Sequence, residues 1–188
     1  MHDLKPKTAL GGIAPQVDCI GALCISEVET LAIASVAARH GKEQACSKVL
    51  TRELGTEPPE PGQSVLSEPY SALWMAPAQW LLWAAFDTHE DIEAVLKSQF
   101  GSAASVTEQS DGWVCFDISG DSVLDLCERS SSADARGMNT GAAVRTIVHH
   151  MGCFLICLDQ GRKVRFLGPR SSAASLHHAL QKTALAVS

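Results

Sequence analysis

The chain has 188 residues, of which 46% are hydrophobic and 19% charged, and its formal net charge at pH 7 is -6. This length suffices for one domain that buries about 70% of its unfolded surface without metal or disulfide staples. The negative net charge excludes general binding to nucleic-acid backbones as the function, because such binding needs a concentrated Lys/Arg surface. The high apolar share predicts that a partner covers part of the surface.

The N-terminal residues carry no recognisable targeting signal. Residues 1–16 lack the apolar segment of a secretory signal, and no run approaches the roughly 20 apolar residues of a membrane span. We therefore expect a cytoplasmic protein with no membrane or nucleic-acid partner. The cysteines are odd in number and irregularly spaced, so all are predicted to be reduced and buried. They are Cys19, Cys24, Cys46, Cys115, Cys127, Cys153 and Cys157.

The chain is predicted to begin with an irregular arm at residues 1–20, which is rich in Gly and Pro. A short apolar strand follows at 31–37. Apolar residues then recur at helical spacing over 45–54, and Gly55 fits the stop of that helix. The three prolines and one glycine of 56–67 predict an extended connector, since they sustain neither a helix nor a central strand.

Two aromatic-rich strands are predicted next, at 70–75 and 80–86, joined by a hairpin turn at 76–79. Thr88 then opens a capping box with Asp91, and the helix that follows ends before Gly101.

The second half of the chain repeats this order. Strands at 104–108 and 113–118 are predicted to pair across the turn at 110–112, and a short helix follows near 123–127. Three strands and a C-terminal helix complete the half: 142–148, 151–158, 164–167 and 171–186. Turns are predicted at 149–150 and 159–161.

Both halves can therefore be read as two strands, a helix, three strands and a helix, although the strand near Val65 is weak. This pattern predicts a duplicated α+β fold. We expect one domain at 21–188, with pseudo-repeat halves at about 21–101 and 102–188.

The sequence contains no motif for catalysis or metal binding. The spacings HExxH, CxxC, EF-hand, P-loop, GxGxxG and GxSxG do not occur. Adjacent histidines at 149–150 and 177–178 diverge too widely to chelate one ion. On a strand, Cys153 and Cys157 would lie about 13 Å apart. We therefore predict no catalytic, cofactor-binding or metal-binding residue in this chain.

One enzymatic alternative depends on the strand after Gly112. Alternation places Cys115 and Asp117 on one face, so the carboxylate could line a cleft or face water, and water is the simpler interpretation. A stand-alone transferase or hydrolase would use one of these two residues.

Four residues are predicted to contact a partner: Trp80, Trp83, Arg165 and Arg170. The run Trp80–Trp83 is apolar on both faces of its strand, which places it centrally or at an interface. Arg165 and Arg170 belong to a local basic cluster that also holds Arg162 and Lys163. This cluster would suit an acidic partner surface, or it is a solvated strand face and loop.

Four stretches, at residues 35–43, 73–82, 110–120 and 168–176, carry a resemblance to a known family. The most specific is the Trp-x-x-Pro-x-Gln-Trp-Leu segment at 74–81. Taken together they resemble the gamma subunit of heterotetrameric sarcosine oxidase, with a likeness that spans about residues 25–185. The stretch 128–138 departs from the Gly-Cys-Pro-Leu-Asp-like sequence usual there.

The resemblance implies a fold related to the folate-binding module of aminomethyltransferases, with strands exchanged between halves. It also implies a complex with alpha, beta and delta chains. In that scheme the beta-like chain uses FAD and FMN to oxidise an N-methyl amine and reduce oxygen to peroxide. The alpha-like chain binds NAD and tetrahydrofolate, and the delta-like chain carries zinc. The gamma chain has no cofactor and packs against its neighbours.

Two functions follow from the resemblance. The first is a structural subunit of a flavoenzyme that demethylates sarcosine, dimethylglycine, N-methylproline or a similar amine. Its products would be glycine or the demethylated amine, peroxide, and formaldehyde or methylenetetrahydrofolate. The second is a folate-binding or one-carbon-transfer module that acts on its own, although the sequence indicates no carboxylate for a pterin ring.

Overall fold

The computed structural model describes residues 6–188, which form eleven strands, four α-helices and three short 3-10 turns. The chain folds into two compact units. The first unit holds the described residues up to Glu29 together with Asp111–Thr140 and Arg145–Ser188, and the second holds Thr30–Ser110 and Gly141–Val144. Among the described residues, no helix combines the length and the apolar character needed to span a membrane.

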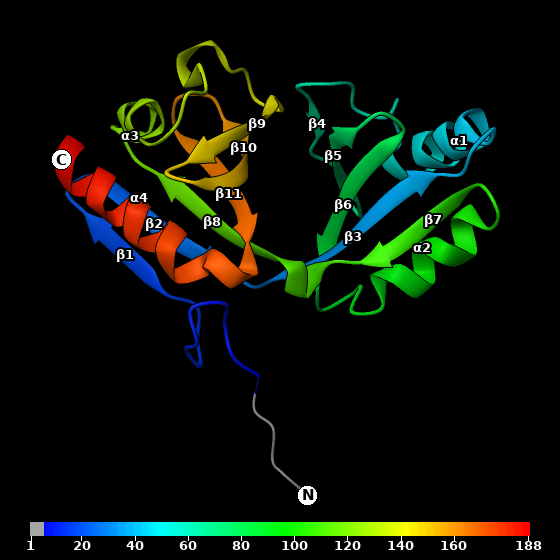
Figure 1. The fold of residues 1–188 in the computed structure, drawn as a ribbon, viewed down its shortest axis with the longest axis horizontal. Coiled ribbons are helices and arrows are strands. Elements are labelled where there is room, and N and C mark those ends of the chain that lie inside the picture. Colours follow the sequence, from blue (N-terminus) through cyan, green and yellow to red (C-terminus); the bar gives the residue numbers. More distant parts are fainter. Residues whose placement is uncertain (1–5) are drawn as a thin grey trace, which may run out of the picture. The chain divides into compact units, whose positions relative to one another are not determined.

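The first unit is built on a six-stranded antiparallel sheet in the order β1-β2-β8-β11-β10-β9. Its strands are β1 (Val17–Ile20), β2 (Leu23–Val28), β8 (Trp113–Ser119), β9 (Ala143–Val148), β10 (Met151–Asp159) and β11 (Lys163–Pro169). Helix α4 (Ala173–Val187) packs against β1, β2 and β11, and α3 (Val123–Ser130) packs against α4 (Figure 1).

Helix α4 is amphipathic, and its buried stripe explains why it covers the sheet. Leu176, Leu180 and Ala184 recur every four residues and are fully buried. His177 stacks on Phe116 of β8, with ring centroids 5.4 Å apart, and its Nε2 lies 2.8 Å from the Asp18 carboxylate. The polar contact therefore fixes the helix to β1 while the aromatic contact fixes it to the centre of the sheet.

The second unit is built on a five-stranded sheet in the order β4-β5-β6-β3-β7. Its strands are β3 (Leu31–Ala38), β4 (Ser64–Val65), β5 (Ser71–Ala76), β6 (Gln79–Ala85) and β7 (Ala104–Glu108). Helices α1 (Glu43–Leu54) and α2 (Ile92–Phe100) supply Leu50 and Leu96 to a core that also contains Val36 and Leu82 of the sheet. Helix α2 lies against β3, whose Ala32 and Ala34 are fully buried in this core.

The order of elements shows a duplication with exchanged strands. The series β2, β3, α1, β4 to β6 and α2 is repeated as β7, β8, α3, β9 to β11 and α4. However, β2 of the first series pairs with β8, and β7 of the second series pairs with β3, so the two series exchange these strands between their sheets. The predicted duplicated α+β fold is confirmed, including the exchange that the family resemblance implied.

The predicted hairpin between the strands at 104–108 and 113–118 is wrong. Strand β7 pairs with β3 in the second unit, and β8 lies between β2 and β11 in the first. The intervening 3-10 turn at Ser110–Gly112 thus connects two different sheets. A turn signal in the sequence reports only a local reversal of the backbone, and it does not identify the strand that each neighbour will pair with.

Two local expectations near helix and strand ends also need correction. The predicted irregular arm at 1–20 contains β1, which forms a hairpin with β2 through Gly21 at a φ of 57°. Residues 1–5 of that arm lie outside the described residues. Helix α2 begins at Ile92 with Asp91 at the N-cap position and no side-chain cap, and the Thr88 hydroxyl donates to the Ala85 carbonyl at 3.2 Å.

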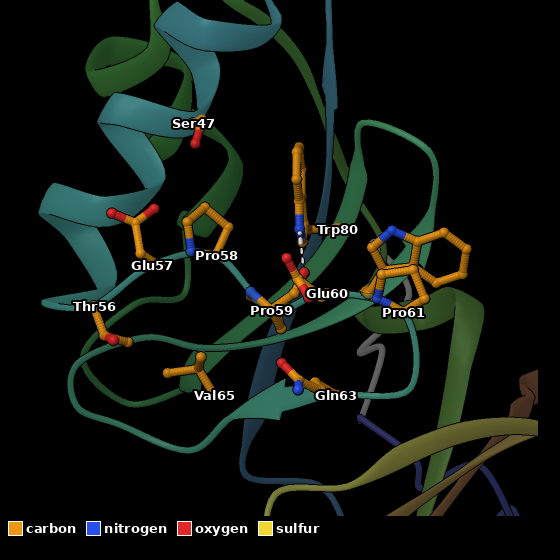
Figure 2. Close-up of a pocket in the computed structure, with 11 residues that line it drawn as sticks. Ser47, Thr56, Glu57, Pro58, Pro59, Glu60, Pro61, Gln63, Val65 and Trp80 are labelled. Carbon is orange, nitrogen blue, oxygen red and sulfur yellow. Dashed lines mark hydrogen bonds between the residues drawn. The ribbon is translucent and has the colours of Figure 1, made fainter.

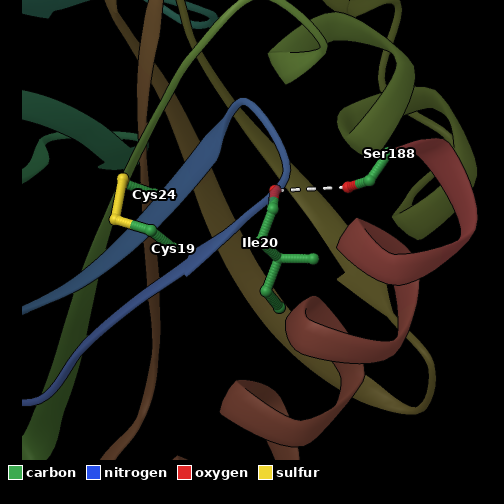
Figure 3. The surroundings of a disulfide bond; sticks show 4 residues. All are labelled: Cys19, Ile20, Cys24 and Ser188. Atoms are coloured by element: carbon green, nitrogen blue, oxygen red, sulfur yellow. Dashed lines mark hydrogen bonds between the residues drawn. A yellow bond between two sulfur atoms is a disulfide. The ribbon is translucent and has the colours of Figure 1, made fainter.

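The β1–β2 hairpin also corrects the expectation that every cysteine is reduced (Figure 3). Cys19 and Cys24 are directly opposite, with Cα atoms 4.1 Å apart, and their sulfurs are bonded. Facing residues of an antiparallel pair come this close without distorting the strands. The sequence interpretation missed the hairpin and therefore this proximity. The hydroxyl of Ser188 donates to the Ile20 carbonyl at 3.2 Å, which ties the end of α4 to the same hairpin.

The five other cysteines are free and buried, and their chemistry can be tested by alkylation. Burial raises the pKa of the Cys115 and Cys127 thiols to about 12 and that of Cys46 and Cys153 to about 11. Thiolate is the reactive form, so the native protein is expected to react negligibly with iodoacetamide at pH 8.

Mass spectrometry after unfolding provides the count of labels. In the unfolded chain without reductant, we expect the five free cysteines to be alkylated. Cys19 and Cys24 should be labelled only after the disulfide has been reduced. Labelling of either residue without reductant would contradict the disulfide, whereas rapid labelling of the native chain would contradict the burial of the free thiols.

Candidate functional site

A groove of about 570 Å³ lies in the second unit, beside the proline-rich connector that follows α1 (Figure 2). Connector residues 56–61 and 63 form much of its wall. Ser47 of α1, Val65 of β4, Trp74 of β5 and Trp80 of β6 contribute the rest. All these lining residues belong to the second unit.

The two tryptophans come together because of an irregularity in the β5–β6 hairpin. The hairpin turns at Pro77 and Ala78, with a φ of 56° at Ala78, and Ala76 pairs with Gln79. A shift in register between Trp74 and Ala76 then places Trp74 opposite Trp80. Directly opposed residues project from the same face of a sheet. Both indoles therefore contribute to one wall of the groove.

Hydrogen bonds hold the connector in place beside this hairpin. Figure 2 shows the Nε1 of Trp80 donating to the Pro59 carbonyl, at 3.1 Å. Further along, the Trp74 amide donates to the Gln63 carbonyl at 3.2 Å, and the Ser64 amide donates to the Gly141 carbonyl at 2.7 Å. The connector is thus attached to the sheet at several points, and its prolines restrict the backbone further.

Among the described residues that line the groove, every charged side chain is acidic. Glu57 and Glu60 are exposed carboxylates, and the lining contains no Lys, Arg or His. Within residues 6–188, the lining contains no Cys or Asp, and its only side-chain hydroxyls are those of Ser47 and Thr56. Such a lining provides surface and charge for binding, but it does not pair a nucleophile with a base.

Comparison with known proteins identifies the family. The sequence matches the model of the sarcosine oxidase, gamma subunit family over residues 39–184. The chain belongs to this family. A search of curated proteins gave no match.

The structure of this gamma-family chain is similar to two solved structures. It matches a chain of the heterotetrameric sarcosine oxidase from Corynebacterium sp. U-96, in complex with pyrrole 2-carboxylate, with a TM-score of 0.74 and 19% identity. The match covers 90% of this chain and 87% of that one. Aminomethyltransferase T of the glycine cleavage system from Bartonella henselae gives a TM-score of 0.59 with 14% identity. That match covers 82% of this chain and 44% of the transferase chain, and it confirms the related fold.

The predicted contact residues Trp80 and Trp83 have different surroundings in the gamma-family chain. Trp80 is half-buried, packs against the core of the second unit and lines the groove. Trp83 is only 6% exposed, so it offers little surface to a partner. Sequence reasoning did not connect Trp80 with Trp74 and the connector, because their proximity depends on the irregular register of the hairpin.

Arg165 forms an internal ion pair, so it is not available to an acidic partner surface. Its guanidinium donates two hydrogen bonds to the Asp117 carboxylate, at 2.6 and 3.0 Å, and Lys163 approaches the same carboxylate at 2.9 Å. Burial opposes the charged form of Arg165, but the hydrogen bonds and charge of Asp117 outweigh it and raise the pKa of Arg165. The expectation that Asp117 faces water is wrong, since this residue is only 8% exposed.

The enzymatic alternative based on Cys115 and Asp117 therefore has little support. The Cys115 thiol is fully protonated at neutral pH, because burial raises its pKa to about 12. The Asp117 carboxylate is engaged by two cations. Neither group is arranged to attack or deprotonate a substrate.

Arg170 is the remaining predicted contact residue, and it is partly accessible. Its guanidinium donates to the Lys7 carbonyl at 3.0 Å and lies 3.6 Å from the exposed Asp111 carboxylate. The predicted basic cluster thus divides into a buried pair at Arg165 and an exposed contact at Arg170, which fixes part of the N-terminal segment.

The histidine pairs do not assemble into a metal site within residues 6–188, where no group of three or more His, Cys, Asp or Glu side chains has a suitable arrangement. His149 and His150 form the predicted turn between β9 and β10. His177 is buried against Phe116, whereas His178 is exposed.

Proposed function

We propose that this chain is a non-catalytic structural subunit of a heterotetrameric sarcosine oxidase-type flavoenzyme. The family match over residues 39–184 carries the proposal. Its partners would be alpha, beta and delta chains, which would hold FAD, FMN, NAD, zinc and tetrahydrofolate. The assembly would oxidatively demethylate sarcosine or a related N-methyl amino acid, and form peroxide with formaldehyde or methylenetetrahydrofolate.

The chemistry of this chain's own side chains is consistent with a structural role. The Asp117 carboxylate is held in an ion pair with Arg165, and the buried Cys115 thiol is protonated. The groove beside the connector provides indole surface and negative charge, which suit recognition of another molecule. Unreactive side chains together with a groove suited to binding are what we expect of a subunit that contacts its partners and catalyses no reaction itself.

Affinity purification of the tagged chain from its native source tests the proposal. We expect co-elution with flavin-containing chains that absorb near 450 nm, and peroxide production when an N-methyl amino acid is added. The chain purified alone should be colourless and inactive. Recovery of a stable monomer without flavoprotein partners would contradict the proposal.

Calorimetric titration of the isolated chain with tetrahydrofolate separates the proposal from a folate-binding module. No heat of binding is expected, because a shared fold does not transfer a ligand site. Saturable binding would favour the folate-binding alternative.

A further inference from the structure

The polar groups of the groove wall are mainly hydrogen-bond acceptors. Residues 56–61 include three prolines, which have carbonyl groups but no amide hydrogen. The carboxylates of Glu57 and Glu60 add further acceptors. Only part of this capacity is used within the chain, as by the Trp80 Nε1 that donates to Pro59. A ligand with several donors would complement this wall.

The indole rings add a second preference. Trp74 and Trp80 are both half-buried and line the same groove. Indole faces attract nearby cations and also provide apolar surface on which the alkyl stem of a basic side chain can pack. An arginine or lysine side chain meets both requirements, because it combines several donors and a positive charge with an apolar stem.

The charge distribution disfavours a free amino acid in this groove. An N-methyl amino acid is a zwitterion, and its carboxylate would need a cationic or donor-rich partner. The described lining residues supply no cationic side chain, and the carboxylates of Glu57 and Glu60 would repel the carboxylate of the amino acid. A basic side chain within a polypeptide carries no such carboxylate.

The adjacent edge of the sheet is already occupied, so the occupant would not bind as an added strand. The amide of Ser64 in β4 donates to the Gly141 carbonyl, and Ala143 donates to the Gly62 carbonyl at 2.9 Å. Gln63 also forms an isolated antiparallel bridge with Ala142. Recognition must therefore depend on side chains that enter the groove.

We infer that this groove is the docking site for an arginine or lysine side chain from a polypeptide segment of a partner subunit. The inference rests on the proposed function, because it requires an assembly. The ammonium or guanidinium group would lie between the carboxylates of Glu57 and Glu60, and its alkyl stem would pack on Trp74 and Trp80. The volume of about 570 Å³ is sufficient for one long side chain and its flanking backbone.

The partner subunits are first co-purified with the wild-type chain and then separated from it. The test measures how tightly groove variants of the full chain bind these isolated subunits. Glu57→Gln with Glu60→Gln is expected to weaken binding at least tenfold at 50 mM salt. The loss should shrink at 500 mM salt, since screening already weakens exposed ion pairs. Trp74→Ala should weaken binding at both salt concentrations.

A matched control removes the same number of charges elsewhere in the second unit. Asp87→Asn with Glu90→Gln alters exposed carboxylates outside the groove, and it should leave binding unchanged. Circular dichroism of every variant establishes that the fold is retained, so that loss of binding reports on the groove itself.

The possible outcomes separate this inference from the proposed function. If the wild-type chain fails to assemble with flavoprotein chains, the proposed function is wrong. If it assembles and the Glu57/Glu60 variant binds as tightly as the wild type, only the docking inference is overturned. The inference also fails if sarcosine alone saturably changes the tryptophan fluorescence of the wild type but not of that variant, because the groove would then be a small-molecule site.

Discussion

Replacing Gly120 with alanine is expected to destabilise the first unit by about 3 kcal/mol, at the upper end of overpacking costs. Gly120 has a φ of 132°, and a Cβ atom there would lie 2.0 Å from the Ala22 carbonyl oxygen. That oxygen belongs to the turn between β1 and β2, so relief would require movement of the backbone. Urea unfolding followed by circular dichroism measures the loss.

Gly161→Ala provides the matched control in the same unit. Gly161 also has a positive φ, of 71°, but the nearest atom to its Cβ position is the Leu124 Cδ1 at 3.9 Å. Only the left-handed backbone opposes this substitution, so a cost of about 1 kcal/mol is expected. Similar losses for the two variants would show that the close approach of Gly120 to Ala22 is not what requires glycine.

Replacing Asp117 with alanine is expected to reduce the free energy of unfolding by about 3 kcal/mol, the lower end for breaking a buried ion pair. The side chains of Asp117 and Arg165 are only 10% and 12% exposed, so the variant leaves a guanidinium with little access to water. Lys163 would add repulsion, since it lies 2.9 Å from the same carboxylate and loses its partner too. Urea unfolding again provides the measurement.

Two further variants identify the cause of that loss. The double variant Asp117→Leu with Arg165→Met should recover most of the stability, because it removes both buried charges and retains the volume. Asp111→Asn should change stability little, since the Asp111 carboxylate is 90% exposed and lies 3.6 Å from Arg170. A double variant as unstable as Asp117→Ala would show that side-chain packing is responsible, and not the unpaired charge.

Local signals in the sequence were sufficient for most of the secondary structure. Helix α1 ends at Leu54 because Gly55 adopts the left-handed conformation, with a φ of 71°. The apolar runs that form β10 and β11 are separated by a turn containing Gly161, which also has a positive φ. Each of these features depends on residues close together in the sequence, and each was predicted.

Pairings between distant segments could not be predicted in the same way. Asp117 and Arg165 are 48 residues apart, and they meet only because β8 pairs with β11 in a particular register. Trp74 faces Trp80 only because the register shifts within the hairpin. Strands β1 and β2 carry charged and polar residues such as Asp18 and Glu27, so their apolar pattern is weak.

The strand exchange has a consequence for synthesis of the chain. Strand β2 leaves the ribosome early, but its partner β8 follows only after the whole of Thr30–Ser110. At roughly 5–20 residues per second, the delay is on the order of ten seconds. During this time one edge of the β1–β2 hairpin has no partner from its own sheet, which makes it prone to pair with other chains. Slower translation lengthens this delay, so we expect it to reduce the yield of folded protein, whereas added chaperones that cover the unpaired edge should increase it.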